Sequence, residues 1–184
     1  MTRRTIVVGL FSASALASMS PAFASPLVAG DEDDLVESKN RRFFASPSAD
    51  RKYTMVFRRA KPKNQLLWRM AGWNNVAFLS DDGELLTVGY LGSDLLTRAD
   101  RRKEVEMLTS YRRGVRSQSI TLGQMIKAPE ALACMGENCR WGQFRGYVSL
   151  HRVEVHTVEG RRLVFDMLTG RLLSEEVLTQ EGAR

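Results

Sequence analysis

Apolar and polar residues alternate along most of this chain with a period of two, which is typical of β-strands that bury one face. The clearest case is the stretch 78–90, where two apolar runs are separated by Asp81-Asp82-Gly83. Gly83 can adopt the positive φ that a tight turn requires, and both aspartates can accept hydrogen bonds from nearby backbone N–H groups. An Asp-Gly turn between two apolar runs predicts a β-hairpin.

The same pattern predicts strands on the N-terminal side of this hairpin. Residues 53–57 alternate, with Tyr53, Met55 and Phe57 on one face and Thr54 on the other. A polar connector containing Pro62 follows, and 66–70 is the predicted return strand.

Further hairpins are predicted on the C-terminal side. Strands at 105–111 and 115–122 flank the turn 112–114, and strands at 153–157 and 162–165 flank Glu159-Gly160. The charged stretch 94–103 predicts an exposed excursion, and 122–135 is the one stretch with helical spacing. The fold class expected is therefore mainly β: an antiparallel meander, a twisted sheet or a partial-propeller-like module, with one or two short helices.

The first 24 residues have the composition of a signal peptide. A positive segment with Arg3 and Arg4 precedes an apolar, Ser/Ala-rich run at 6–19, and Ala22-Phe-Ala24 supplies small residues before Ser25. Thr2-Arg3-Arg4 and the residues after it resemble a twin-arginine export signal, although any secretory signal also carries positive charge. We therefore expect a periplasmic or secreted protein with no transmembrane segment in the mature chain, and the export route stays open.

Removal of residues 1–24 leaves about 160 residues, enough for one domain with a core. We expect an acidic, disordered leader at 25–42, a single β-rich domain at 43–178 and a frayed tail at 179–184. Residues 39–184 hold 25 basic and 16 acidic side chains, so the body is basic. The leader is either a solvated segment or an arm that shields a basic surface.

Cys134 and Cys139 are the two cysteines of the chain. In an oxidising compartment they favour one disulfide, and Gly136 and Asn138 between them allow the chain to turn back. A redox pair or half of a metal site is the alternative, although a redox pair usually has two intervening residues.

No residue pattern predicts a catalytic, cofactor or metal site. His151 and His156 are five residues apart, an odd offset that places them on opposite faces of one strand. Asp81 and Asp82 lack the acidic residues that would follow them in a Ca²⁺ loop, and turn chemistry explains both.

Basic pairs and tryptophans supply the candidate binding surface. Arg58-Arg59, Arg101-Arg102, Arg112-Arg113 and Arg161-Arg162 recur along the chain, and an exported protein meets little nucleic acid. We expect an anionic envelope component or another envelope protein as partner, and no nucleic acid. The residues proposed for this surface flank turns: Trp73, Arg112, Arg113 and Trp141. Packing in the core or at a sheet edge is the alternative for both tryptophans.

Two resemblances follow from the motifs. Ser80–Leu86 and Gly160–Leu173 resemble parts of a β-propeller blade, but a closed propeller requires at least four blades. The span 76–173 also resembles an uncharacterised group of exported bacterial β-rich proteins, through Ser80-Asp-Asp-Gly83, Tyr111-Arg-Arg-Gly114, Trp141 and Asp166-Met-Leu-Thr-Gly170. These are turn and core residues, so the resemblance implies a fold and no activity.

Two functions remain open on the sequence. The first is a non-enzymatic envelope protein that binds or supports another exported component. The second is a hydrolase that acts on envelope polysaccharide with a carboxylate pair, which requires two carboxyl groups about 5–10 Å apart. Asp81, Asp82 and Asp166 are the residues to inspect for that pair.

Overall fold

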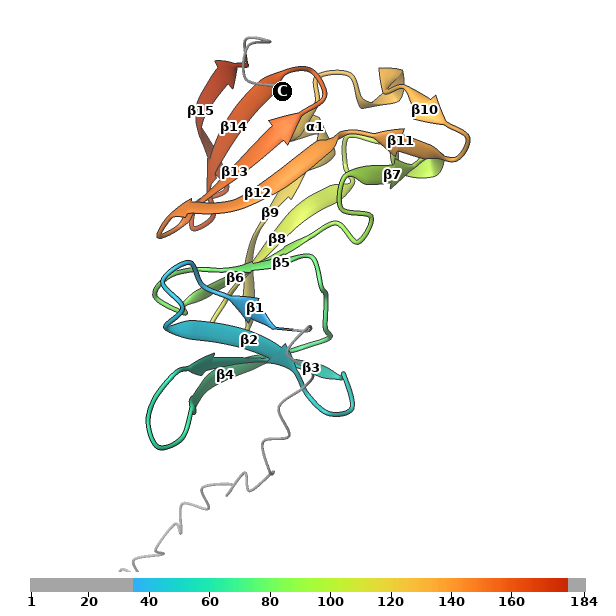
Figure 1. The fold of residues 1–184 in the computed structure, drawn as a ribbon. Coiled ribbons are helices and arrows are strands. Elements are labelled where there is room, and N and C mark those ends of the chain that lie inside the picture. The colour runs from blue at the N-terminus through green and yellow to red at the C-terminus, as the bar shows by residue number, and fades with distance from the viewer. Residues whose placement is uncertain (1–34, 179–184) are drawn as a thin grey trace, which may run out of the picture.

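Antiparallel sheets make up the part of the chain that the computed structural model describes, residues 35–178 (Figure 1). Three of these sheets have four strands each, connected as meanders. The first sheet has the order β1-β2-β3-β4, with bounds Val36–Glu37, Phe43–Pro47, Tyr53–Arg58 and Gln65–Ala71. The central sheet has the order β5-β6-β8-β9, with bounds Ala77–Leu79, Leu85–Gly89, Glu106–Arg112 and Val115–Thr121. The last sheet has the order β12-β13-β14-β15, with bounds Gly142–Ser149, Arg152–Thr157, Arg161–Asp166 and Arg171–Val177.

A small sheet and short helical turns lie in two connections, one between β6 and β8 and one between β9 and β12. The small sheet has the order β10-β11-β7, with bounds Cys134–Met135, Asn138–Arg140 and Leu95–Thr97. The helical turns are α1 (Leu122–Met125) and two 3-10 turns, Arg98–Asp100 and Pro129–Ala131. The predicted fold class is confirmed: mainly β, with antiparallel four-stranded meanders such as those that form propeller blades.

The central sheet packs between the other two four-stranded sheets, and each of its faces belongs to a separate core. Alternation along β6 sends Leu85 toward the last sheet, where it joins a buried cluster with Val155 and Phe165. Leu86 points the other way and joins a second buried cluster with residues of the first sheet, Phe43, Ala45 and Val56. Because both faces of the central sheet are covered, it connects the three sheets into one body.

One turn design recurs at three of the hairpins. At β5–β6 the Ser80 hydroxyl donates to Asp82 Oδ1 at 2.6 Å, and the Glu84 N–H donates to the same oxygen at 2.9 Å. The turns from Ser48 to Tyr53 and from Ser38 to Phe43 repeat this pattern with Asp50 and Asn40. The confirmed Asp-Gly hairpin is therefore one copy of a Ser-x-Asx turn.

Gly83 is required in the central copy of this turn. Its φ is +71°, and an added Cβ would lie 2.5 Å from a ring carbon of Phe43 in the first sheet. The turn thus needs glycine both for its conformation and for the close approach of the two sheets.

The buried face of β3 differs from the predicted one. Thr54 is buried, with its hydroxyl donating to Gly72 O at 2.6 Å, while Tyr53 is 37% exposed. Val56 and Phe57 are both buried on opposite faces of the strand, Val56 in the cluster with Leu86 of the central sheet and Phe57 against Phe44. Alternation along β3 is kept, as its regular pairing with β2 shows, but which of the two faces packs against the central sheet depends on tertiary contacts.

The stretch 94–103 is not wholly an exposed excursion. It contains β7, which pairs with β11, and Leu96 on that strand is fully buried. The predicted helical stretch 122–135 contains α1 and a 3-10 turn, but its last two residues form β10. The sequence did not predict this short strand, because charged residues follow it and only one of its side chains faces the core.

The described fold begins within the segment expected to be a disordered leader. β1 pairs with β2 through Val36 and Ala45, and the Asn40 N–H donates to Asp81 Oδ1 at 2.7 Å. Residues 25–34, the signal-peptide stretch 1–24 and the tail 179–184 lie outside the described residues.

Candidate functional site

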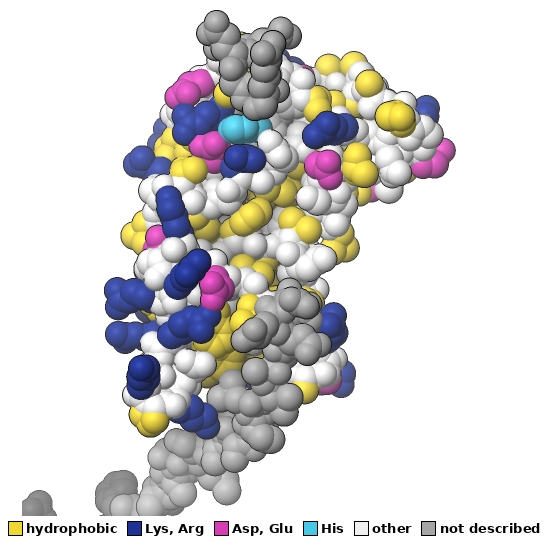
Figure 2. All heavy atoms as spheres, viewed as in Figure 1, with side chains coloured by type: hydrophobic (Ala, Val, Ile, Leu, Met, Phe, Trp, Pro, Cys, Tyr) yellow, Lys and Arg dark blue, Asp and Glu magenta, His cyan; other side chains and the backbone are white. Residues whose placement is uncertain are grey.

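The first sheet carries most of the excess positive charge. Residues 36–71 contain ten lysines and arginines and two acidic side chains. All ten cations are exposed. Figure 2 shows Lys and Arg side chains gathered over the lower half of the molecule, where Figure 1 places the first sheet. A concentration of like charge on one element creates a positive potential that attracts anions.

Both acidic side chains of this sheet are already paired. Glu37 forms ion pairs with Arg59 and Arg41, and Asp50 forms one with Lys52 at 3.4 Å. Hydrogen bonds from Ser48 and from the Lys52 N–H lower the pKa of Asp50, so it is ionised at neutral pH. The two acidic side chains of the sheet thus pair with Arg41, Arg59 and Lys52 and are not available to the other cations.

The outer face of the first sheet, which points away from the central sheet, is aromatic as well as basic. Phe44 pairs across strands with Phe57, and their rings stack with centroids 5.1 Å apart. The Arg59 guanidinium lies 4.9 Å from the centre of the Phe44 ring. Arg69 lies 4.8 Å from the centre of the Tyr53 ring. Both guanidinium groups thus cover the apolar faces of aromatic rings on this sheet.

The turn Arg112-Arg113 lies against this sheet. An added Cβ on the next residue, Gly114, would lie 2.3 Å from Arg69 O in β4. Arg113 is neutralised by a two-point ion pair with Glu84, at 2.6 and 2.9 Å. Arg112 is exposed and extends the basic surface.

The tryptophans proposed for the same surface lie elsewhere. Trp141 is fully buried, and its indole N–H donates to Ser93 O at 2.7 Å, so it belongs to the core. Trp73 is half-buried, and its neighbour Asn74 donates to Gly89 at the end of β6 opposite to Arg112. The four proposed residues thus do not form one surface. The excess of lysines and arginines over acidic residues in 36–71 was the sequence feature that could have predicted the basic surface of the first sheet.

A second feature is a groove of about 500 Å³ where the first strands of the three large sheets meet. β5 forms its floor, and Figure 1 shows this strand between β12 above and β1 below. The charged residues that line the groove come from the two sides: Glu37, Lys39, Arg145 and Glu154. Phe78 and Tyr147 contribute apolar walls.

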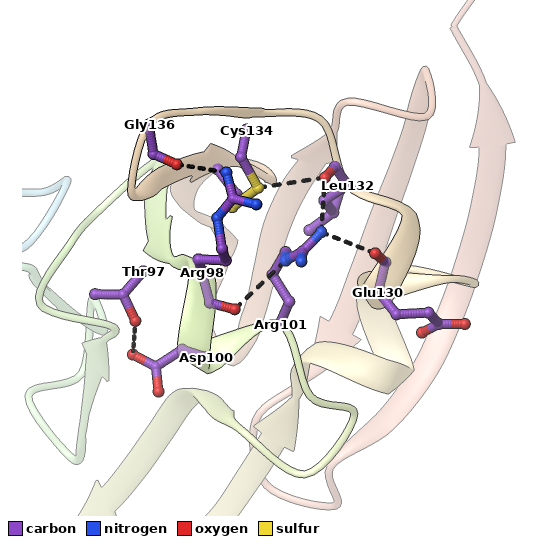
Figure 3. Close-up of a disulfide and its surroundings, with 9 residues drawn as sticks. Thr97, Arg98, Asp100, Arg101, Glu130, Leu132, Cys134 and Gly136 are labelled. Atoms are coloured by element: carbon purple, nitrogen blue, oxygen red, sulfur yellow. Dashed lines mark hydrogen bonds between the residues drawn. A yellow bond between two sulfur atoms is a disulfide. The ribbon is translucent and has the colours of Figure 1, made fainter.

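The disulfide predicted from the sequence is present, between Cys134 and Cys139, which face each other across β10 and β11 (Figure 3). Arg98 donates to Gly136 O at 2.8 Å, at the tip of this hairpin. Arg101 donates to Glu130 O at 2.8 Å, on the segment that leads into it. These contacts stabilise the disulfide-linked hairpin. Because Arg101 makes such a contact, it is not part of an exposed basic surface.

The carboxylates considered for hydrolysis have structural partners. Asp81 accepts the Asn40 N–H, and Asp166 accepts the N–H groups of Leu168 and Thr169 in its own turn. Asp82 lies 3.0 Å from His151 Nε2, a contact that joins the β5–β6 turn to the turn between β12 and β13.

Burial acts to raise the pKa of Asp82, but hydrogen bonds from Ser80, the Glu84 N–H and His151 outweigh it and lower that pKa. Neither the groove described above nor the smaller hollow beside β6 and β8 is lined by Asp81, Asp82 or Asp166.

The second histidine and the last basic pair also belong to local networks. His156 Nε2 lies 2.8 Å from Glu154 Oε1, and Arg162 donates to the other oxygen of that carboxylate at 2.8 Å. The bond from Arg162, opposed by burial and supported by His156, lowers the pKa of Glu154. Arg161 is buried and pairs with Glu159 and Glu175, so this pair is not a free basic surface.

Within residues 35–178 no cluster of three or more His, Cys, Asp or Glu side chains is arranged to hold a metal ion. The helices of the same residues include none that is long and apolar enough to span a membrane.

Comparison with known proteins identifies no family. No protein-family model matches the chain, and no curated protein matches it. Among solved structures, the chain is similar to the C-terminal WD40 domain of Sif2, with 10% sequence identity and a TM-score of 0.34. The match covers 76% of this chain and 34% of that chain, so it spans about a third of the other protein's length.

Proposed function

We propose that this protein is an exported, non-enzymatic module that binds an acidic component of the cell envelope through its first sheet. The single observation that carries the proposal is the charge of that sheet, ten exposed cations with two acidic side chains that are both already paired. Export rests on the signal-peptide pattern of residues 1–24, and the resemblance to exported bacterial β-rich proteins supports the same setting.

The aromatic outer face adds a reason for a protein partner rather than a small anion. Arginines lie over the ring of Tyr53, which is 37% exposed, and over the ring of Phe44, which stacks on Phe57 and is largely covered. Aromatic and arginine side chains are both enriched at protein interfaces. A partner with carboxylates and apolar side chains would pair with both features. Its association should be fast at low salt and weaken as salt screens the charges.

Photo-crosslinking in the native envelope tests this proposal. A photoreactive phenylalanine analogue replaces Leu66, which is 45% exposed on the first sheet, or Leu172, which is 43% exposed on the last sheet. We expect a specific cross-linked product from position 66 and none from position 172. The mass of the purified chain in the same preparation reports whether it begins at Ser25.

Charge variants then test the cause of binding. The variant with Arg58→Gln, Lys61→Gln and Lys63→Gln removes three cations of the β3–β4 connector. A control with Lys103→Gln, Arg152→Gln and Arg171→Gln has the same net charge. Exposed charges contribute up to about 1 kcal/mol each, so removal of three should weaken binding by up to about a hundredfold. Equal cross-linking at both positions, or equal binding by the two variants, would contradict the proposal.

A further inference from the structure

The central groove has an unpaired strand edge as its floor. Among the strands of residues 35–178, β5 is the edge strand of the central sheet and pairs with β6 alone, with Phe78 opposite Thr87. Hydrogen bonds from Gly89 to Val76 and from Ser80 to Leu85 flank that pair. In an antiparallel ladder the bonded positions alternate, so the N–H and C=O groups of Ala77 and Leu79 point away from β6.

Those outward groups border the groove, since Ala77 and Leu79 both line it. A strand edge with free donors and acceptors is the template on which an extended peptide adds a strand. The volume of about 500 Å³ lies within the range of about 300–1,000 Å³ typical of ligand sites. The geometry therefore suits a short extended segment rather than a folded domain.

The charges around the groove select an acidic segment. Glu37 is neutralised by Arg59, and Glu154 is neutralised by Arg162 and His156. Lys39 and Arg145 are exposed, and neither makes an ion pair within the described residues. The groove thus has two available cations and no available carboxylate among its charged lining residues.

The two cations lie on opposite sides of the central sheet. Lys39 belongs to the β1–β2 turn of the first sheet, and Arg145 belongs to β12 of the last sheet. Side chains of a strand added to β5 would alternate between these two sides. Acidic residues at neighbouring positions would face both cations, whereas acidic residues two positions apart would face one side only.

We propose that this groove binds an acidic peptide segment of the partner in an extended conformation, as a strand added to β5 with adjacent acidic residues directed at Lys39 and Arg145. The inference rests on the proposed function, because it assumes an acidic protein partner. It specifies the site at which a segment of that partner binds and the conformation of that segment.

Two synthetic peptides of equal composition test the register. Both are acetylated and amidated: Val-Thr-Asp-Glu-Val-Thr has adjacent acids, and Val-Asp-Thr-Glu-Val-Thr has them two positions apart. Calorimetry or fluorescence anisotropy should show the first peptide binding several-fold more tightly. A third peptide, the first with alternate backbone nitrogens methylated, should lose binding because it cannot form the ladder. Equal binding of all three would overturn the proposal.

Variants of the protein locate the site. Ala77→Pro removes the outward N–H while it leaves the bonded positions of β6 untouched, and it should abolish peptide binding. Lys39→Gln with Arg145→Gln leaves the backbone intact and should weaken binding about tenfold, whereas the control Lys103→Gln with Arg171→Gln should not. If the two double variants bound alike, the site would lie elsewhere and the proposal would fail.

The outcomes separate this inference from the proposed function. Persistent cross-linking at position 66 without peptide binding would retain the envelope-binding function and overturn the groove. Loss of both would overturn both. Self-association that competes with the peptide would assign the groove to a second copy of the chain and also overturn the proposal.

Discussion

Asp82 joins the central sheet to the last sheet, and replacing it measures how much that contact stabilises the protein. Its Oδ1 accepts hydrogen bonds from Ser80 and from the Glu84 N–H, and its Oδ2 lies 3.0 Å from His151 Nε2. The side chains of Asp82 and His151 are 29% and 25% exposed. The contact is therefore a partly screened one between two turns that are distant in sequence.

The chain itself shows what Asp82→Asn would retain. In the equivalent turn at Ser38, the amide oxygen of Asn40 accepts bonds from the Ser38 hydroxyl and the Arg42 N–H, both at 2.9 Å. Asparagine can thus form the turn but cannot offer a second oxygen to His151. We expect Asp82→Asn to lower the free energy of unfolding by about 1 kcal/mol at pH 7. For a domain of this size the melting temperature should fall by about 2–4 °C.

The pH dependence gives the decisive measurement. Because the pKa of Asp82 is lowered in the folded protein, its stabilising contribution is present above about pH 4 and is lost as the pH falls through the folded pKa. The free energies of unfolding of the parent and Asp82→Asn, measured in urea, should therefore differ at pH 7, and the difference should shrink as the pH is lowered to 3.

Asp50 provides the matched control. It accepts the same local bonds from Ser48 and the Lys52 N–H, and these partners all belong to its own turn and not to the last sheet. Asp50→Asn should therefore change stability less than Asp82→Asn. An equal effect of both substitutions, or a difference that is the same at pH 7 and pH 3, would refute the inter-sheet role of Asp82.

Two further predictions concern the hairpin and the core. Replacing both Cys134 and Cys139 by serine should lower the free energy of unfolding by about 2 kcal/mol, because the short closed loop no longer restricts the entropy of the unfolded chain. A reductant should lower the melting temperature of the parent but not that of the variant. Burial raises the pKa of Tyr147, whose hydroxyl lies 2.7 Å from Thr87 Oγ1. Its ionisation therefore opposes folding as the pH rises above about 10, the ordinary value for tyrosine. In an alkaline absorbance titration of the folded protein, Tyr147 should ionise late, and Tyr147→Phe should remove that late step. An unchanged curve would contradict the assignment.

Several features of this protein are determined by residues close together in the sequence. Asp81-Asp82-Gly83 specifies a hairpin because Gly83 tolerates a positive φ and a serine and an aspartate bond their own turn. Cys134 and Cys139 meet because a short turn separates them. Local chemistry of this kind acts before any tertiary contact forms, so sequence reasoning predicted these hairpins, the disulfide and the mainly β fold class.

Tertiary structure decided which residues share a surface. Trp141 flanks a strand in the sequence like a surface residue, yet packing of the central sheet against the last sheet buries it completely. Packing against the central sheet decided that the face of β3 with Thr54 and Val56 is the inner one, although Tyr53, Met55 and Phe57 are the more apolar set. Lys39 and Arg145 are over a hundred residues apart and meet at one groove only because the first strands of three sheets converge there. Burial and convergence depend on the packing of whole sheets, which no local pattern encodes.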